Sequence, residues 1–225
     1  MKKLAIISAF IILCVTAFAQ NKTLQPVIAE VIMPGNSSLD FNITNKVHPD
    51  TGLQNVMRWK NRIVFYTKTK DVIGFERLII KNFGKNKVIF FQNPFYNFNR
   101  KYCSDKTVAK EWTNIILSAN LVNDPKMQQE YLNYHATQFQ KWPEVSQGFC
   151  NAHFQQLLVF KTGRQLMLVI SIPKGKTLDE LNPLTSKNNP RVDDWNKMMS
   201  KYQEGIEGTK KGETWVFFKD IDKDK

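Results

Sequence analysis

The sequence predicts an α+β fold in two parts, because its pattern of apolar residues changes near residue 108. Residues 20–108 hold short segments dense in Val, Ile, Phe and Tyr, separated by turn residues, which is typical of strands. From residue 109 onward, such segments alternate with longer stretches of helical period. With 42% hydrophobic and 12% aromatic residues, the chain can bury a substantial core.

Residues 1–19 predict a signal peptide. The basic start "MKK" is followed by the apolar run "LAIISAFIILCVTAF" and by "AFA", a small-x-small cleavage signal before Gln20. The apolar run is too short for a stable membrane span. We therefore expect a secreted or periplasmic protein that does not span the membrane.

The first part, residues 20–108, predicts a β-rich N-terminal domain of unknown function. Its expected strands are "NRIVFYTKT", "VIGFERLIIKN" and "KVIFFQN". The segment "NPFYNFNRKYC" interleaves aromatic and basic residues and could stack on bases or sugar rings. We favour an edge strand or loop whose aromatic side chains pack inward, and we expect no nucleic-acid partner because no such motif surrounds it.

Charge is unevenly distributed along a chain of net charge +12. Residues 20–108 carry fourteen Lys/Arg against six Asp/Glu, and residues 109–225 carry sixteen against fourteen. An acidic glycan or cell surface is therefore a candidate partner of the first part. A solvated basic surface without any partner fits the same charges.

Two cysteines, Cys103 and Cys150, remain after the expected leader. An oxidising compartment permits a disulfide between them. Two buried thiols fit the sequence equally well.

The second part predicts a βαββαβ order over residues 109–220, followed by a charged tail at 221–225. A strand at "NIILSANLV" precedes a helix that Asp124 caps, and "HFQQLLVF" and "QLMLVISI" form a hairpin around Gly163. A helical stretch interrupted by Pro183 and Pro190 leads to the last strand, "ETWVFFKD". This order is that of a ferredoxin-like domain.

We expect this domain to form a homodimer of the dimeric α/β-barrel type. A ferredoxin-like sheet leaves one face uncovered, and "QLMLVISI" supplies apolar side chains to both faces. The N-terminal part could instead cover that face within one chain.

His135 is the candidate catalytic residue. The spacing of Tyr131, Tyr134, His135, Phe139 and Trp142 predicts one helical stripe that faces the sheet. A histidine on such a stripe is either a reactive group in a pocket or an ordinary core residue with a hydrogen-bond partner. The spacing does not distinguish the two readings.

Four fragments of this part resemble the L-rhamnose mutarotase family: "EYLNYH", "WPEV", "DDWNKMMSKYQ" and "KGETW". The resemblance covers residues 113–218 and implies a sugar mutarotase that interconverts the anomers of a deoxyhexose by acid/base ring opening. It implies that His135 is the catalytic acid and that Tyr131 and Trp195 contact the sugar. Asn196 stands where the family has a second tryptophan, and Gln155 or Gln156 stands where it has an aromatic on the second strand, so we assign Gln156 to the substrate site.

The implied reaction protonates the ring oxygen while it removes the proton of the anomeric hydroxyl. An imidazole that titrates near neutrality suits the donor role, and no metal or cofactor is expected. His48 and His153 have no Cys, Asp or Glu at metal-ligand spacing. The alternative function is a non-catalytic secreted protein that binds a glycan or a surface on a ferredoxin-like scaffold.

Overall fold

The computed structural model describes residues 23–35 and 53–221. The expected signal peptide and residues 222–225 of the expected tail lie outside this part. The described strands form one sheet in the order β4-β1-β3-β2-β10-β6-β8-β7-β5, with β9 paired to β6. This sheet consists of two half-sheets, β1 to β4 and β5 to β10.

The first half-sheet contains four strands and one described helix. They are β1 (Gln25–Ile32), β2 (Leu53–Trp59), β3 (Arg62–Thr69), α2 (Val72–Phe83) and β4 (Lys87–Phe91). Its spatial order is β4-β1-β3-β2, and every described pairing within it is antiparallel. The strands expected at "NRIVFYTKT" and "KVIFFQN" are confirmed as β3 and β4.

The strand predicted at "VIGFERLIIKN" is wrong, because this segment is helix α2. The Asp71 side chain caps it by accepting a hydrogen bond from the Gly74 backbone N–H at 2.9 Å. Phe75, Ile79 and Phe83 recur every four residues and are the buried residues of the helix. The density of Val, Ile and Phe hid this helical period.

The second half-sheet carries the remaining strands and helices. They are β5 (Tyr96–Asn99), η1 (Arg100–Tyr102), β6 (Trp112–Leu121), α3 (Pro125–Ala136), α4 (Gln138–Lys141), α5 (Pro143–Asn151), β7 (Gln156–Thr162), β8 (Gln165–Pro173), α6 (Leu178–Leu181), α7 (Pro183–Ser186), α8 (Pro190–Met199), η2 (Ser200–Tyr202), β9 (Gln203–Glu204) and β10 (Val216–Asp220). The βαββαβ order is confirmed, and β10-β6-β8-β7 is the strand order of a ferredoxin-like α+β fold. The helices are more divided than the sequence predicts, since the first ends at Ala136 and continues as α4 and α5.

The four strands of the first half-sheet and the strands β6, β7, β8 and β10 of the second have the same order, with the fourth beside the first and the third beside the second. They join through the edge pair β2·β10, at Arg58↔Lys219 and Met57↔Asp220. The chain passes from one half-sheet to the other between Phe91 and Tyr96, because β5 pairs with β7. This crossing precedes the domain boundary expected at residue 108.

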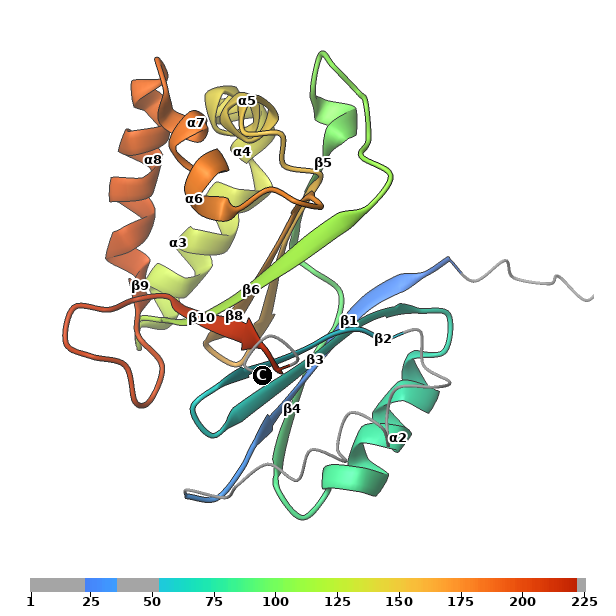
Figure 1. Ribbon diagram of the computed structural model, residues 1–225. Coiled ribbons are helices and arrows are strands. Elements are labelled where there is room, and N and C mark those ends of the chain that lie inside the picture. The colour runs from blue at the N-terminus through green and yellow to red at the C-terminus, as the bar shows by residue number, and fades with distance from the viewer. Residues whose placement is uncertain (1–22, 36–52, 222–225) are drawn as a thin grey trace, which may run out of the picture.

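Helices lie on the two outer sides of the molecule, with the strands between them (Figure 1). Helix α2 packs on the outer face of the first half-sheet, and helices α3 to α8 lie over the outer face of the second. Side chains alternate between the two faces of a strand, so every second residue of each half-sheet points inward.

These inward side chains form an apolar layer between the half-sheets, here called the inner layer. Its buried members come from both halves of the chain: Ile28, Met57, Val64, Tyr66, Phe91, Ile116, Leu158, Phe160, Met167, Val169, Ile206, Val216 and Phe218. The apolar face that motivated the homodimer prediction is therefore covered by the first half-sheet of the same chain. No helix in the described residues is both long and apolar enough to cross a membrane.

A buried ion pair interrupts the inner layer. The Arg62 Nη1 donates to Glu30 Oε1 at 3.0 Å, and the two side chains are 7% and 0% exposed. Gln165 Nε2 donates to the other carboxylate oxygen at 2.8 Å. Glu207 lies 3.9 Å from the same guanidinium but is 95% exposed.

We predict that Glu30→Ala lowers the free energy of unfolding by about 3–5 kcal/mol, because it leaves Arg62 buried without a close partner. Glu207→Ala removes an exposed partner of the same arginine and should change it by less than about 1 kcal/mol. Urea unfolding of both variants measures the difference. Similar small losses in the two variants would contradict the structural role of the buried pair.

Candidate active site

A cavity of about 380 Å³ lies between the outer face of the second half-sheet and the helices above it. Apolar side chains of two adjacent strands face it: Leu157, Val159, Leu168 and Ile170. The opposite wall comes from α3, α5 and α8. All three sugar-site residues that the family resemblance placed on helices, His135, Tyr131 and Trp195, line this cavity.

Helix α3 positions Tyr131 and His135 together. Asp124 Oδ1 caps the helix by accepting from the backbone N–H groups of Lys126 and Met127, at 2.8 and 3.2 Å, and Pro125 occupies the first turn, as predicted. Residues four apart lie on one face of a helix. Tyr131 and His135 are accordingly the two buried residues of α3.

The His135 ring is enclosed by four aromatic rings from three segments of the chain. Its centroid lies 4.3 Å from that of Tyr131, 5.2 Å from that of Trp195, 5.3 Å from that of Tyr96 and 5.6 Å from that of Phe95. The histidine is only 7% exposed. Such surroundings disfavour a positive charge on the ring.

The protonation state of His135 follows from its single hydrogen bond within the described residues. Its Nδ1 lies 3.0 Å from the backbone oxygen of Tyr131. A carbonyl oxygen only accepts, so Nδ1 carries the proton of the neutral ring and Nε2 carries a lone pair. Burial lowers the pKa of His135 to about 4, although the hydrogen bond to Tyr131 opposes this shift. The expectation that this imidazole titrates near neutrality is therefore wrong.

The Tyr131 hydroxyl is oriented by a short hydrogen-bond chain. Trp215 Nε1–H donates to Gln203 Oε1 at 3.1 Å, and Gln203 Nε2 donates to the Tyr131 hydroxyl oxygen, also at 3.1 Å. The hydroxyl therefore keeps its own hydrogen for another acceptor. Burial raises the pKa of Tyr131 well above its usual value, so the phenol stays protonated.

Trp195 stands on α8, a helix that begins at Pro190 after its N-cap residue Asn189. The indole is only 6% exposed and meets Trp142 at 5.6 Å between ring centroids. The Arg191 guanidinium lies over the Trp142 ring at 3.8 Å. The contacts with Trp142 and Arg191 hold Trp195 in the wall of the cavity. Asn196, the next residue of α8, also lines the cavity.

Gln156 does not line the cavity, contrary to its assignment to the substrate site. Its neighbour Leu157 faces the cavity, so Gln156 points to the inner layer, where its Oε1 accepts from Lys68 Nζ at 2.8 Å. Gln155 is also absent from the cavity, because its amide bonds to Ala109 N and His153 O.

Sequence reasoning missed four aromatic residues that line the cavity: Tyr96, Phe149, Phe154 and Trp215. Tyr96 is the one that contacts the His135 ring. It comes from β5, the strand beside β7, and its hydroxyl donates to Gln138 Oε1 at 2.5 Å. The segment "NPFYNFNRKYC" was predicted as an edge strand or loop with inward-packing aromatics, and this is confirmed by the burial of Tyr96 and Phe98. Further polar lining residues that carried no sequence signal are Asn182, Ser200, Gln203 and Thr214.

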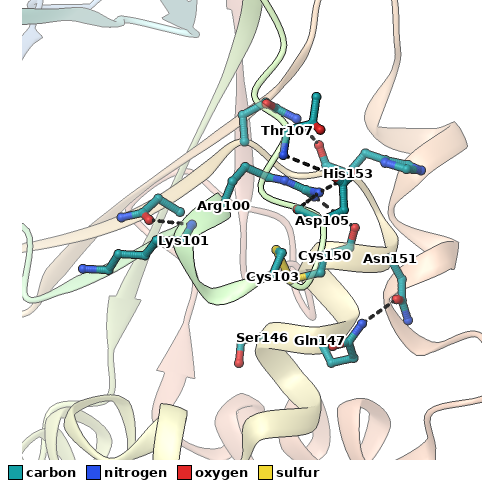
Figure 2. Close-up of a disulfide and its surroundings, with 12 residues drawn as sticks. Arg100, Lys101, Cys103, Asp105, Thr107, Ser146, Gln147, Cys150, Asn151 and His153 are labelled. Atoms are coloured by element: carbon teal, nitrogen blue, oxygen red, sulfur yellow. Dashed lines mark hydrogen bonds and ion pairs between the residues drawn. A yellow bond between two sulfur atoms is a disulfide. The ribbon is translucent and has the colours of Figure 1, made fainter.

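A disulfide between Cys103 and Cys150 ties the segment after β5 to the end of α5 (Figure 2). Arg100 reinforces this link by donating to the Cys150 backbone oxygen at 3.2 Å and by pairing with Asp105 at 3.3 Å. Two walls of the cavity, those of Tyr96 and of α5, are thereby covalently connected. His153 lies beside this link and is exposed, outside the cavity.

Among the residues that the structure describes, no Asp, Glu, Lys or Arg lines the cavity. In residues 23–35 and 53–221, no group of three or more His, Cys, Asp or Glu is placed to hold a metal ion. An imidazole lone pair, an oriented phenol and an indole give this cavity polar groups and an apolar face that suit a small, uncharged, polar molecule.

Comparison with known proteins names the family. The model described as L-rhamnose mutarotase matches residues 104–221, just over half of the chain, and the chain belongs to the L-rhamnose mutarotase family. It is thus a sugar mutarotase, an isomerase acting on an aldose. It is similar to an L-fucose mutarotase of Xanthomonas campestris pv. campestris, with 25% identity over 97 residues that cover 43% of this chain and 75% of the relative.

Similar solved structures are more distant. A putative monooxygenase from Fusobacterium nucleatum subsp. nucleatum has a TM-score of 0.48 at 8% identity, over 88% of this chain and 91% of that chain. A ferredoxin-fold protein from Listeria monocytogenes, related to antibiotic biosynthesis monooxygenases, has a TM-score of 0.43 at 10% identity, over 88% and 95%.

We predict that His135 titrates with a midpoint at about 4, measured from its ring-proton NMR signals, with those of the exposed His153 as reference in the same spectra. The pKa is lower in the folded than in the unfolded chain, so His135 should reduce stability as the pH falls from about 6.5 toward 4. A midpoint near 6.5, the ordinary value for histidine, would contradict the buried, neutral ring.

Proposed function

We propose that this protein interconverts the anomers of a deoxyhexose such as L-rhamnose outside the cytoplasm. The observation that carries the proposal is the His135 ring, with its Nδ1 bound to the Tyr131 carbonyl and its Nε2 lone pair left for a ligand. A free sugar is uncharged, which agrees with a cavity that no charged side chain lines. Family membership supplies the class of reaction.

In the proposed mechanism His135 shuttles one proton between two oxygens on the anomeric carbon. Nε2 removes the proton of the anomeric hydroxyl, the carbonyl forms, and the bond from C1 to the ring oxygen breaks. The ring oxygen takes the electron pair of that bond and the proton from Nε2. After rotation about C1–C2, the same steps in reverse close the ring on the other face of the carbonyl.

The lowered pKa of His135 suits this shuttle. The ring is neutral at physiological pH, so Nε2 is available as a base without prior deprotonation. Once protonated, an imidazolium that burial destabilises is a strong acid and returns the proton readily. The family resemblance implies that His135 is the catalytic acid. In this mechanism it acts as the acid in the second step, when Nε2 gives its proton to the ring oxygen.

Tyr131 and Trp195 bind and orient the sugar in this proposal. The Tyr131 hydroxyl accepts from Gln203, so it has a hydrogen to donate to a sugar oxygen. The Trp195 indole offers an apolar face for the C–H groups of the ring. Asn196, where the family has its second tryptophan, offers an amide at the same wall.

Secretion is supported by two features other than the residues that line the cavity. The leader at residues 1–19 has the three parts of a signal peptide. The disulfide between Cys103 and Cys150 is a bond of oxidising compartments such as the periplasm or the cell exterior.

The homodimer and the non-catalytic binding function, both expected from the sequence, stay predictions. A homodimer of this protein would need a surface other than the inner layer, since the first half-sheet occupies that face. A non-catalytic sugar-binding protein would use the same cavity and aromatic rings without proton transfer, so the two functions differ in whether a bound sugar exchanges its anomers.

We predict that the protein accelerates anomer exchange of L-rhamnose or L-fucose, measured by exchange NMR of the anomeric protons. His135→Ala should lower this acceleration by about 10²–10⁴-fold, the usual contribution of a proton-transfer residue. His153→Ala, which removes an exposed histidine outside the cavity, should leave it unchanged.

Binding of these sugars without exchange would support the binding-protein alternative. Full activity in a folded His135→Ala variant would remove His135 from the mechanism. Loss of folding in that variant, together with an inactive parent protein, would identify His135 as a core histidine.

We predict that Tyr131→Phe weakens sugar binding about three- to tenfold, which corresponds to one lost hydrogen bond. Exchange of the bound sugar should fall less than in His135→Ala, because the shuttle residue remains. Tyr134→Phe changes a neighbouring tyrosine that does not line the cavity and is the matched control. Equal losses in the two variants, measured by NMR titration, would contradict a direct contact of Tyr131 with the sugar.

A further inference from the structure

A second hollow of about 540 Å³ opens on the inner-layer side of the second half-sheet. We call it the Lys68 groove. Its strand residues are Asn55 of β2, Lys68 of β3, and Trp112 and Asn114 of β6, and the segment 108–110 completes it. Asn114 alternates with Ile115, which packs on the helix side, so the groove and the sugar cavity lie on opposite faces of β6.

Lys68 is a part-buried cation without an acidic partner. Its Nζ donates to Gln156 Oε1 at 2.8 Å and lies 4.9 Å from the Trp112 ring centroid. No carboxylate of the described residues is within ion-pair distance of it. Burial lowers the pKa of Lys68, so its two neutral partners, Gln156 and Trp112, leave room for a countercharge. An anion in the groove would supply that countercharge.

Trp112 gives the groove an aromatic wall of fixed orientation. Its indole Nε1–H donates to the Ala109 backbone oxygen at 2.9 Å, so the ring is held at the groove rather than free to rotate. Val108, which is 54% exposed, adds apolar surface beside it. An indole face of this kind suits the C–H face of a sugar ring.

An ordered row of amides completes the groove. Ser171 Oγ donates to Asn114 Oδ1 at 2.7 Å, and Asn114 Nδ2 donates to Asn55 Oδ1 at 2.8 Å. These two hydrogen bonds fix the orientation of both side-chain amides. The side-chain NH₂ group of Asn55 has no partner among the described residues. This group can donate to hydroxyl oxygens of a ligand.

From this combination we infer that the Lys68 groove binds a uronate, a sugar ring that carries a carboxylate. The carboxylate would pair with Lys68, and Lys110 is the second cation that lines the groove. Among the residues that the structure describes, no Asp or Glu lines it. The ring would lie against Trp112, and its hydroxyls would accept from Asn55. The groove volume is within the range of about 300–1,000 Å³ that is usual for ligand sites.

The test uses methyl α-D-galacturonide, whose blocked anomeric carbon prevents ring opening, so it is no mutarotase substrate. The Trp112 indole N–H signal is followed by NMR during titration, with methyl α-D-galactoside as the uncharged counterpart. We expect a saturable shift with the galacturonide and at least tenfold weaker binding of the galactoside. Oligogalacturonide is titrated separately, to distinguish a chain from a single ring as the source of the uronate.

Lys68→Met keeps most of the aliphatic stem and removes the charge, so it should weaken galacturonide binding at least tenfold without changing the melting temperature or the anomer exchange of deoxyhexoses. Lys81→Met, an equal change of charge on the exposed side of α2, should have no effect on binding. Saturating L-rhamnose should not displace the galacturonide.

Equal binding by the Lys68→Met protein would overturn the inference, as would equal weakening in Lys81→Met, which would indicate general charge attraction. Displacement by L-rhamnose would place the galacturonide in the sugar cavity instead. An inactive parent protein that still binds the galacturonide through Lys68 would refute the proposed mutarotase activity and leave the groove intact.

Discussion

The alternation of side chains along β6, β7 and β8 is the constraint on which this structure depends. Both faces of these strands are buried, one by the helices and one by the first half-sheet. On β7 and β8, a residue at one position therefore faces the sugar cavity, and its neighbour faces the inner layer. Leu157 and Gln156 illustrate the consequence, because a shift of one residue separates a cavity wall from a partner of Lys68.

Local sequence signals predicted those features that depend on neighbours in the chain. The Asp124 cap and the four-residue spacing of Tyr131 and His135 are enough to place both side chains on one helix face. Tyr96 could not be predicted in the site, because it arrives through the pairing of β5 with β7, a contact between segments far apart in the chain. Helix α2 was missed for a different reason, since an amphipathic helix rich in Ile and Phe has the composition of a strand.

The chemistry of His135 also comes from tertiary structure rather than from residue type. An isolated imidazole titrates near 6.5, but four aromatic rings and a backbone carbonyl fix both its charge and its tautomer here. The two readings left open by the sequence, a core histidine and a reactive one, are compatible in this site. Burial sets the properties of the ring, while the cavity leaves one of its nitrogens for a ligand.

The joining of two half-sheets in one chain has a consequence for how such a protein can vary. When two identical subunits pair through their sheets, every substitution at the contact occurs twice, and the two binding sites stay equivalent by symmetry. Here Tyr66 and Val64 face Phe160 and Met167 rather than copies of themselves. One half can therefore change without altering the other. The cavity on one side can stay the same while the surface on the other side changes.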